Sequence, residues 1–561
     1  MEKEYQQLSF AYVKSPDEDV MPPVPPVHHP VVIVGAGPVG LATAIDLAQQ
    51  GVATVVLDDD CTLSTGSRAI CFAKRSLEIF DRLGCGDRMA EKGVSWNVGK
   101  VFFQDQMVYS FDLLPESGHR RPAFINLQQY YVEGYLLDRA QELPNIDLRW
   151  KNKVSGIVQN EEHAELTIET PNGPYQLQCD YVVAADGARS SVRHLSGLES
   201  KGRTFRDRFL IVDIRMTADF PSERWFWFDP PFHPNQSVLL HRQPDNMWRI
   251  DFQLGWDADP IAEKQAEKVI PRVQALLGND VEFELVWVSV YTFSCLRMDK
   301  FRHGRVFFAG DAAHGVSPFG ARGANSGVQD AENLAWKLKL VLQNKAPQTL
   351  LDSYAEEREY AADENILHST RATDFITPKS DISRSFRDAT LRLAKKYDFA
   401  RQLVNSGRLS KPATLFDSSL NTKDRDVFNG AMVPGAAIAD APVIVQGQSH
   451  WFSACVGNEF AGIYFYDSAS VARLSSFDFR DIHLKQLVVV PPQSAGLKLE
   501  GFDVIVDVEG LLAKRFDAVP GTYYLLRPDQ HVCARWRQFD AGLVRDAVMR
   551  ATRNLVETSV A

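Results

Sequence analysis

The sequence predicts an α/β fold in which a dinucleotide-binding domain is interrupted by a mostly antiparallel sheet. Three observations support this prediction. Residues 31–58 follow the order apolar strand, glycine-rich turn, helix, strand and acidic residue. Two further short apolar runs, at 181–185 and 306–309, also lead into small residues and an aspartate, as expected of buried parallel strands. Between residues 200 and 300 the pattern alternates with period two, most clearly at 248–254, which favours half-buried antiparallel strands.

The first of these units is a complete dinucleotide fingerprint. A strand at 31–34 leads into Gly35-Ala-Gly37-Pro-Val-Gly40, a helix follows, and Asp58 comes directly after the next strand. Gly35 makes the tight turn, Gly37 lets a pyrophosphate approach the backbone, and Gly40 lets helix and strand pack closely. Asp58 lies about 20 residues further on, where it can bind a ribose hydroxyl. The motif predicts a dinucleotide but does not separate FAD from NAD.

Two polar residues after this unit have both a functional and a structural interpretation. Arg68 lies between a loop of small residues and a helix, so it either neutralises the pyrophosphate, lies near a cofactor ring, or is a surface arginine. Gln129 lies at the start of a helix expected at 130–143. It either bonds a cofactor phosphate or ring edge, or caps the helix.

Asp186 and Asp311 follow the second and third apolar runs. Asp186 heads a turn that either serves the same cofactor or packs beneath the first turn. Asp311 faces the crevice in which open α/β sheets bind ligands, and there it can accept hydrogen bonds from a polyol or sugar hydroxyl.

The loop after Asp311 contains Pro318 and opens a helix with one apolar face. The start of this helix offers the N–H groups of Ala324, Asn325 and Ser326 and the positive end of the helix dipole. Such a loop suits an electron-rich planar ring such as a flavin. The alternative is an ordinary strand–loop–helix that binds no ligand.

Aromatic residues accumulate in the inserted region, which would cover a planar, apolar substrate. Trp225, Trp227 and Phe252 are the candidates for its pocket. Their alternative role is that of plain hydrophobic core.

Composition restricts the class of protein. The net charge of the 561 residues is −11, which argues against nucleic acid as a partner. No apolar run reaches the roughly 18 residues of a membrane span, and the polar N-terminus lacks a signal pattern, so we expect a cytoplasmic protein. The seven cysteines and thirteen histidines show no metal-ligand spacing, so we expect no metal. Residues 1–29 are rich in proline towards their end and are expected to form an extended arm.

The three strand ends predict one extended ligand with a dinucleotide half and a ring half. FAD fits this description better than NAD, because a nicotinamide dehydrogenase does not need the third loop. A nicotinamide donor has no fingerprint of its own here and would visit the flavin transiently.

At this point the chain resembles a known family. VVIVGAGPVGLATAIDLAQQG, YVVAADGARSSVR and GRVFFAGDAAHGVSPFGARGANSGVQDAENLAWKL look like the three motifs of single-component FAD aromatic hydroxylases. YYLLRPDQHVCARW is similar to the end of the thioredoxin-like domain in the phenol hydroxylase branch, in the group of 3-(3-hydroxyphenyl)propionate hydroxylases.

The resemblance implies a domain organisation in four parts. It implies an N-terminal arm at 1–29, a discontinuous FAD-binding domain at 30–200 and 300–410, a substrate-binding sheet region at 85–125 and 201–299, and a thioredoxin-like domain at 425–561. The last domain has no C-x-x-C motif, so redox work is not expected there.

The resemblance also implies a reaction. NADH or NADPH reduces FAD, O2 adds to the flavin C4a, and the hydroperoxyflavin hydroxylates a phenolic ring, such as that of a hydroxyphenyl-carboxylic acid. By their positions in the family's motifs, the residues that would bind FAD are Gly35, Gly37, Gly40, Asp58, Arg68, Gln129 and Asp311. The backbone of Gly323, Ala324 and Asn325 would lie at the ring, with Pro318 beside it. Asp58 stands where the family more often has Glu.

Hydroxylation would be assisted by a base that deprotonates the phenol. His241, at the end of an apolar strand, is the candidate, and a surface or capping histidine is the alternative.

Two other functions stay open. Flavin halogenases share the fold and carry W-x-W-x-I-P, which the sequence approaches at Trp225-Phe-Trp227-Phe-Asp229-Pro230, but with Asp in place of Ile. The second is a non-catalytic flavin-binding protein. For the assembly, a homodimer is one expectation.

Overall fold

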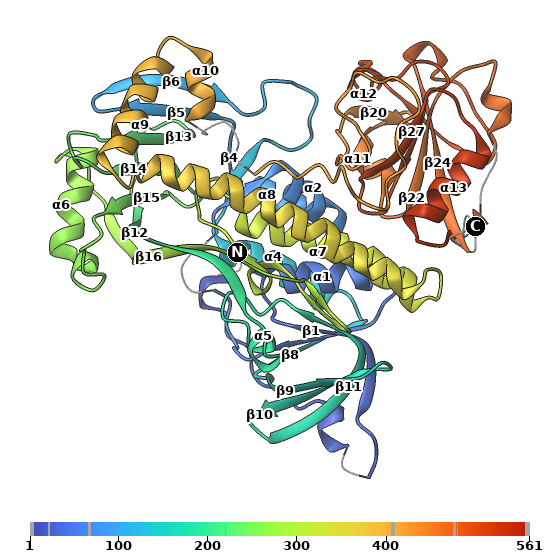
Figure 1. Ribbon diagram of the computed structural model, residues 1–561, viewed down its shortest axis with the longest axis horizontal. Coiled ribbons are helices and arrows are strands. Elements are labelled where there is room, and N and C mark those ends of the chain that lie inside the picture. The colour runs from blue at the N-terminus through green and yellow to red at the C-terminus, as the bar shows by residue number, and fades with distance from the viewer. Residues whose placement is uncertain are drawn as a thin grey trace.

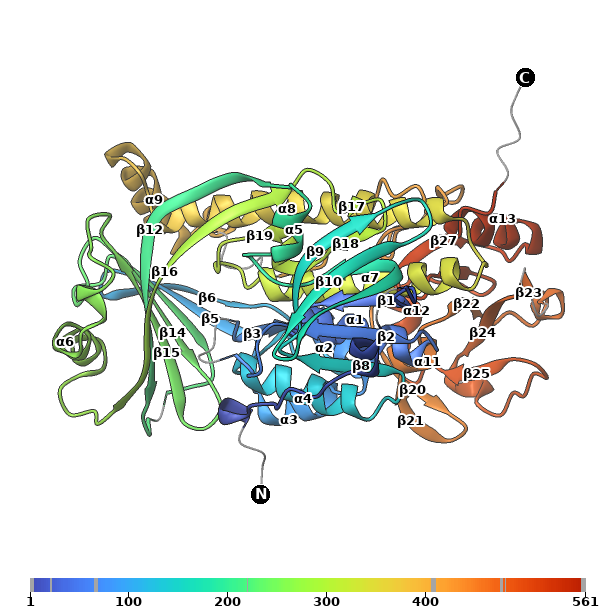
Figure 2. The same ribbon diagram turned by 90° about the horizontal axis from the view of Figure 1, so that it is seen from below.

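The computed structural model describes residues 5–20, 23–64, 69–218, 220–404, 410–474, 478–479 and 481–555. A parallel sheet with its helices forms the centre of the molecule, a large antiparallel sheet lies at one end and a C-terminal unit at the other (Figures 1 and 2). Among the described helices, none is both long enough and apolar enough to cross a membrane.

The central sheet contains five parallel strands in the order β18-β11-β1-β2-β8. Its strands are β1 Val27–Val34, β2 Thr54–Asp58, β8 Ile146–Trp150, β9 Lys153–Gln159, β10 Ala164–Thr170, β11 Gly173–Ala184, β17 Arg302–His303 and β18 Val306–Phe308. The middle strands are continuous apolar runs and are buried, because helices pack over them. The helices of this domain are α1 Pro38–Gln49, α2 Lys74–Leu83, α3 Gly86–Lys92, α4 Gln129–Gln141, α5 Ser191–Leu195, α7 Gly323–Leu342 and α8 Asp352–Ile376.

The antiparallel sheet has the order β19-β16-β12-β15-β14-β13-β5-β6, in which only β13 and β5 pair in parallel. Its strands are β5 Val98–Phe103, β6 Gln106–Asp112, β12 Ser200–Arg215, β13 Arg224–Phe228, β14 Ser237–Arg242, β15 Met247–Leu254, β16 Glu284–Met298 and β19 His314–Gly315. One face packs against α6 (Ala266–Leu277). The other packs against the end of α8 and against α9 (Asp381–Ala394) and α10 (Asp398–Leu403).

A small sheet, β3-β7-β4, lies between the central domain and the antiparallel sheet. Its strands are β3 Cys71–Ala73, β4 Val94–Trp96 and β7 Phe124–Asn126. Hydrogen bonds from Asn126 and Gln128 to the backbone of residues 242 and 244 attach it to the antiparallel sheet.

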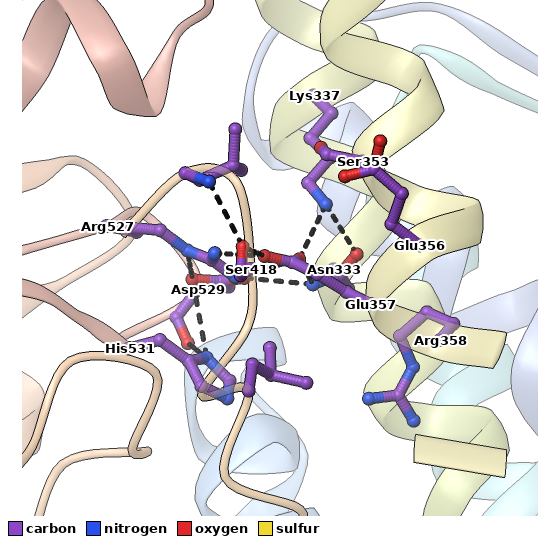
Figure 3. Close-up of polar contacts among 12 residues, drawn as sticks. Asn333, Lys337, Ser353, Glu356, Glu357, Arg358, Ser418, Arg527, Asp529 and His531 are labelled. Atoms are coloured by element: carbon purple, nitrogen blue, oxygen red, sulfur yellow. Dashed lines mark hydrogen bonds and ion pairs between the residues drawn. The ribbon is translucent and has the colours of Figure 1, made fainter. Parts of the chain in front are cut away.

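The C-terminal unit is a mixed sheet with the order β21-β20-β25-β24-β22-β26-β27. Its elements are β20 Pro442–Val445, β21 Gln448–Trp451, α11 Phe452–Val456, β22 Phe460–Phe465, β23 Asp478–Phe479, β24 Ile482–Val490, β25 Asp503–Val506, α12 Leu511–Arg515, β26 Tyr523–Leu526, β27 Val532–Trp536 and α13 Ala541–Ala551. The turn between β26 and β27 inserts its side chains against α7 and α8 (Figure 3).

The described residues among the first 29 differ from the extended arm expected at 1–29. Two short 3-10 helices, Tyr5–Gln7 and Pro16–Asp19, lie within them, and Ser15 and Glu18 form a capping box at the second. β1 begins at Val27, because residues 27–29 already pair with 177–179 of β11. The proline-rich stretch therefore ends inside the sheet.

Candidate active site

The three turns singled out from the sequence lie side by side at the carboxyl edge of the central sheet. Backbone hydrogen bonds from the N–H groups of Gly35, Ala185 and Ala309 join β1 to β2, β11 to β1 and β18 to β11, with N···O distances of 2.7, 2.8 and 3.0 Å. The turns that follow these strands are therefore neighbours, as ligand binding at this edge of an open sheet requires.

The first turn leaves a helix start open. Gly35 has a φ of +105°, and a Cβ on Gly40 would lie 1.9 Å from the Gly35 carbonyl oxygen, so both positions require glycine. A Cβ on Gly37 would meet nothing within 4 Å. No side chain caps the start of α1, and its first residue is Pro38. An anion can therefore approach this helix end closely.

Asp58 braces the first turn. Its Oδ2 accepts the Ala36 N–H at 2.6 Å and its Oδ1 accepts the Asp60 N–H at 2.9 Å. Burial raises the pKa of Asp58, although these two hydrogen bonds act in the opposite direction. The carboxyl group lies next to the glycine turn, where the fingerprint expects it.

Hydrogen bonds hold the second turn together and tie it to the third. Oδ2 of Asp186 accepts hydrogen bonds from Ser191 Oγ at 3.1 Å and from Val192 N–H at 3.0 Å, while its buried Oδ1 has no partner among the described residues. Arg193 donates to the Ala312 carbonyl of the third turn at 2.7 Å. Sequence reasoning missed Arg193, although it ends the quoted YVVAADGARSSVR motif.

A buried ionic network fixes the third turn. Asp330 of α7 accepts the Gly310 N–H at 2.9 Å and contacts His314 Nε2 at 2.7 Å. Arg358 of α8 donates to the other Asp330 oxygen at 2.6 Å. Burial by itself would raise the pKa of Asp330, but His314 and Arg358 outweigh it and lower that pKa. Sequence reasoning missed all three residues, because they come from separate elements.

Asp311 lies exposed next to the start of α7. A Cβ on Gly323 would lie 4.0 Å from the Asp311 carboxylate. The side chain of Asn325 is buried and holds β3, since Nδ2 donates to the Cys71 carbonyl at 2.9 Å and Oδ1 accepts the Ala73 N–H at 2.8 Å. No side chain caps α7, and Ala324 is half-buried while Pro318 is exposed. This second helix start therefore also faces the carboxyl edge.

Of the two polar candidates after the first unit, Gln129 belongs to the described residues. Arg68 lies outside the described residues. Gln129 accepts the Ala69 N–H at 3.1 Å and donates to Ser64 Oγ at 3.0 Å and to Glu133 at 2.7 Å. It thus contacts a residue on each side of the segment that contains Arg68.

A row of polar side chains crosses the antiparallel sheet on the face that meets the third loop. The strand registers place Arg224 of β13 beside His241 of β14. They pair His241 with Arg249 of β15, and Arg249 with Asp213 of β12. Phe319 of the third loop packs on the same face of β12 and β16, with ring centroids 4.8 Å from Phe209 and 5.3 Å from Phe293.

His241 is 2% exposed, and its Nε2 lies 3.4 Å from Asp251. Burial lowers the pKa of His241, Arg224 lowers it further, and Asp251 opposes both. The neutral ring is therefore favoured, and Nδ1 is buried without a partner among the described residues. A neutral imidazole with an unused nitrogen can accept a proton.

Trp225, Trp227 and Phe252 lie on the opposite face from His241. They belong to the hydrophobic cluster that packs under Val269 and Val273 of α6. The reason is strand alternation, because neighbouring residues of a strand point to opposite faces. The structure does not bring these three aromatic residues together with the cofactor turns.

The residues at the carboxyl edge fit a dinucleotide that carries a ring. Two helix starts without side-chain caps point at this edge, the space at Gly37 and Gly187 is open to a ligand, and Asp311 exposes a carboxylate. Within the described part of the chain, no group of three or more His, Cys, Asp or Glu side chains could hold a metal ion.

Comparison with known proteins agrees with this geometry. Residues 28–369 match the family model described as "FAD binding domain". The chain is 28% identical over 370 residues to a 3-(3-hydroxy-phenyl)propionate/3-hydroxycinnamic acid hydroxylase of Mycolicibacterium smegmatis, which covers 64% of each protein. It is 29% identical to a para-nitrophenol 4-monooxygenase of Pseudomonas sp., over 64% of this chain and 89% of that enzyme. The matched segment thus spans less than two thirds of the first of these relatives.

The similarity in fold covers more of the chain than the similarity in sequence does. The crystal structure of the flavin-dependent monooxygenase PieE in complex with FAD and substrate superposes with a TM-score of 0.76 over 94% of this chain and 99% of that one, at 20% identity. The mixed α/β architecture, including most of the C-terminal unit, is therefore shared with a flavin-dependent monooxygenase.

Proposed function

We propose, from the premise that this chain belongs to the FAD binding domain family, that it is an FAD-dependent monooxygenase of phenolic compounds. The observation that carries the proposal is the meeting of three turns and two helix starts at one sheet edge, in a chain whose antiparallel sheet also holds a buried histidine. When bound, FAD would take a hydride from NADH or NADPH and activate O2 for transfer to the ring.

The chain's own residues would bind and orient this cofactor. The start of α1 with Gly35, Gly37 and Gly40 would receive the pyrophosphate, and Asp58 the ribose. Asp311 would accept hydrogen bonds from cofactor hydroxyls.

The third loop would hold the ring itself. Backbone groups of Gly323, Ala324 and Asn325 would lie at its edge, with Pro318 beside it. Arg68, Gln129 and Asp186 would complete the site, of which Gln129 and Asp186 act by fixing loops.

On the substrate side, His241 would take the proton of the phenol and so make the ring more nucleophilic. Its lowered pKa keeps it neutral, and its Nδ1 is not engaged by any described residue.

We also assign the domains as the resemblance implies, with FAD bound by 30–200 and 300–410 and substrate by the antiparallel sheet. The C-terminal unit from residue 425 would be a thioredoxin-like domain. Its support is a parallel β22–β24 pair followed in the same sheet by the antiparallel β26–β27 hairpin.

A panel of phenols tests the activity. We expect yellow protein whose oxidation of NADH or NADPH is stimulated by at least one phenol, with hydroxylated product formed in matching amount. Protein that holds FAD but neither oxidises NADH or NADPH nor consumes O2 with any phenol would instead support a non-catalytic flavoprotein. Product that depends on chloride or bromide would support a halogenase.

The cofactor role of Asp311 is tested by Asp311→Ala. Loss of a carboxylate that accepts cofactor hydrogen bonds should raise the Kd for FAD by about 10- to 100-fold, measured by flavin fluorescence after reconstitution. Asp299→Ala is the matched control, because Asp299 is an exposed aspartate paired with Lys201. Equal retention of FAD by both variants would contradict the role of Asp311.

A further inference from the structure

Arg224 is a buried cation for which the described part of the chain supplies no counter-ion. Arg224 is 7% exposed. Its buried terminal nitrogen Nη1 has no hydrogen-bond partner among the described residues. Among the described residues no carboxylate forms an ion pair with it. The acid next to it in sequence, Glu223, is engaged by Lys100 at 2.7 Å and by Trp225 Nε1 at 2.7 Å.

The other arginine of the row, Arg249, is paired with a carboxylate. Arg249 donates from Nε and from one terminal nitrogen to the two oxygens of Asp213, both at 2.8 Å. A guanidinium cannot release its proton to escape burial, and a buried charge is costly unless it is paired. The described residues therefore give Arg224 no anion of the kind that Arg249 already has.

A chain of contacts links Arg224 to the start of α7. Its guanidinium is 5.9 Å from the centre of the Trp96 ring, and Trp96 and Cys71 both contact the Asn126 side chain. The Cys71 carbonyl accepts a hydrogen bond from Asn325 in the first turn of α7. Only a few contacts thus separate Arg224 from the helix start assigned to the cofactor ring.

The neighbour of Arg224 in the row, His241, is a second buried polar side chain. His241 also has a buried nitrogen with no partner among the described residues, and the strand register places the two side chains beside each other on one face. Two unsatisfied polar groups at one place on the sheet form a subsite that can be completed from outside the chain.

We propose that Arg224 is the anion-binding residue of the substrate site, and that the aromatic substrate presents a negatively charged oxygen to it. This inference rests on the proposed function for the nature of the substrate. The anion is either a carboxylate on the ring substituent or the phenolate formed when His241 removes the phenol proton. Both present to the guanidinium the oxygen acceptor that Asp213 presents to Arg249.

Ligand titrations of the FAD-loaded protein distinguish a carboxylate from a phenolate as the anion that Arg224 binds. The probes are 3-(3-hydroxyphenyl)propionate, its methyl ester and 4-nitrophenol, and binding is followed by the change in flavin absorbance. The variant is Arg224→Met, with Arg224→Gln in its place if the methionine variant does not retain FAD. The matched control is Arg242→Met, because Arg242 is one residue from His241 and stacks on Trp248 on the opposite face.

We expect Arg224→Met to raise the Kd of at least one probe by about 100-fold, while Arg242→Met stays within about 3-fold of the wild type. A loss confined to the free acid identifies a carboxylate. A similar loss for acid and ester, together with a rise of about one unit or more in the pKa of bound 4-nitrophenol, identifies a phenolate.

Unchanged affinity for all three probes in an Arg224→Met protein that retains FAD would overturn the proposal. So would a wild type that turns over neutral phenols and binds the free acid no more tightly than the ester, with no lowering of the bound phenol's pKa. If Arg224→Met weakens acid binding but the wild type oxidises no NADH or NADPH with any phenol, the anion subsite stands and the proposed function fails.

Discussion

Two of the buried arginines of this protein, Arg527 and Arg224, have opposite surroundings. Arg527, in the turn of the C-terminal hairpin, has a side chain that is 0% exposed. It donates to Glu357 of α8 at 2.5 and 3.1 Å and to Asp529 at 3.0 and 2.5 Å. Arg224, on the antiparallel sheet, has no ion pair with any described residue, and one of its nitrogens lacks a partner.

The difference extends to the residues around each arginine. Lys337 donates to Asn333 and to Glu357, both at 2.8 Å, and Asn333 donates to Glu357 at 2.7 Å (Figure 3). None of these buried groups has an unsatisfied side-chain atom among the described residues. Next to Arg224, by contrast, His241 also keeps an unused nitrogen.

A complete network and an incomplete one have different uses. The network at Arg527 is satisfied by side chains of the protein itself, and it joins the C-terminal unit to α7 and α8. The row at Arg224 needs an anion, so it is suited to a ligand that arrives and leaves. The comparison can be tested by removing members of each network and measuring stability without substrate.

The largest effect is expected from Glu357→Gln. This change keeps the shape of the side chain and removes the charge that compensates Arg527 and Lys337. Because breaking a buried ion pair leaves an uncompensated charge, the free energy of unfolding should fall by about 3–5 kcal/mol, measured by denaturant unfolding.

Glu356→Gln is the control for this change. Glu356 is the neighbouring residue on α8, its side chain is 47% exposed, and it pairs with Arg553. The control should change stability by no more than about 0.5 kcal/mol. Similar losses in the two variants would mean that the network at Arg527 does not stabilise the docked unit.

The sequence predicts the local parts of this architecture well. The strands at 31–34, 54–57, 181–185 and 306–309 and the helix after Pro318 are all present, because short apolar runs and helical spacing are determined by neighbouring residues. The parallel pairing of β13 with β5 could not be foreseen. These strands are separated by more than 100 residues of sequence, and nothing local to either one specifies its partner.

The candidate site also has parts that follow from local sequence and parts that depend on tertiary structure. The glycine turns and Asp58 follow from local spacing, whereas Asp330 and Arg358 reach the third turn from two helices. The row of Arg224 and His241 depends on the register of several strands, which period-two patterns leave open. The same alternation explains why the tryptophans at 225 and 227 face α6 instead of the row.

A second test concerns the proton on Lys337. Burial lowers the pKa of Lys337 from 10.5 to about 8, against the opposing effect of Glu357. Between about pH 8 and 10.5 the unfolded chain therefore holds a proton that the folded chain has released, so this group makes stability rise with pH. Below pH 8 both states hold the proton and the contribution is constant.

Lys337→Met should remove this pH dependence. The difference in unfolding free energy between wild type and variant should change in favour of the wild type by about 1–3 kcal/mol from pH 7.5 to 10. Other titrating groups cancel in this difference, because they are common to both proteins. A difference that stays constant with pH would show that Lys337 keeps its proton inside the complete network.

The smallest effect has the opposite sign and is expected at Arg224. In the complete network every removal leaves a charge behind, but Arg224→Met removes a cation that no described carboxylate compensates. The free energy of unfolding without substrate should therefore stay the same or rise by up to about 1 kcal/mol. Arg249→Met, on the same row, leaves Asp213 buried without its partner and should lower it by about 3 kcal/mol or more. If Arg224→Met were as destabilising as Arg249→Met, Arg224 would be part of the structure's own ionic framework, and the contrast with Arg527 would disappear.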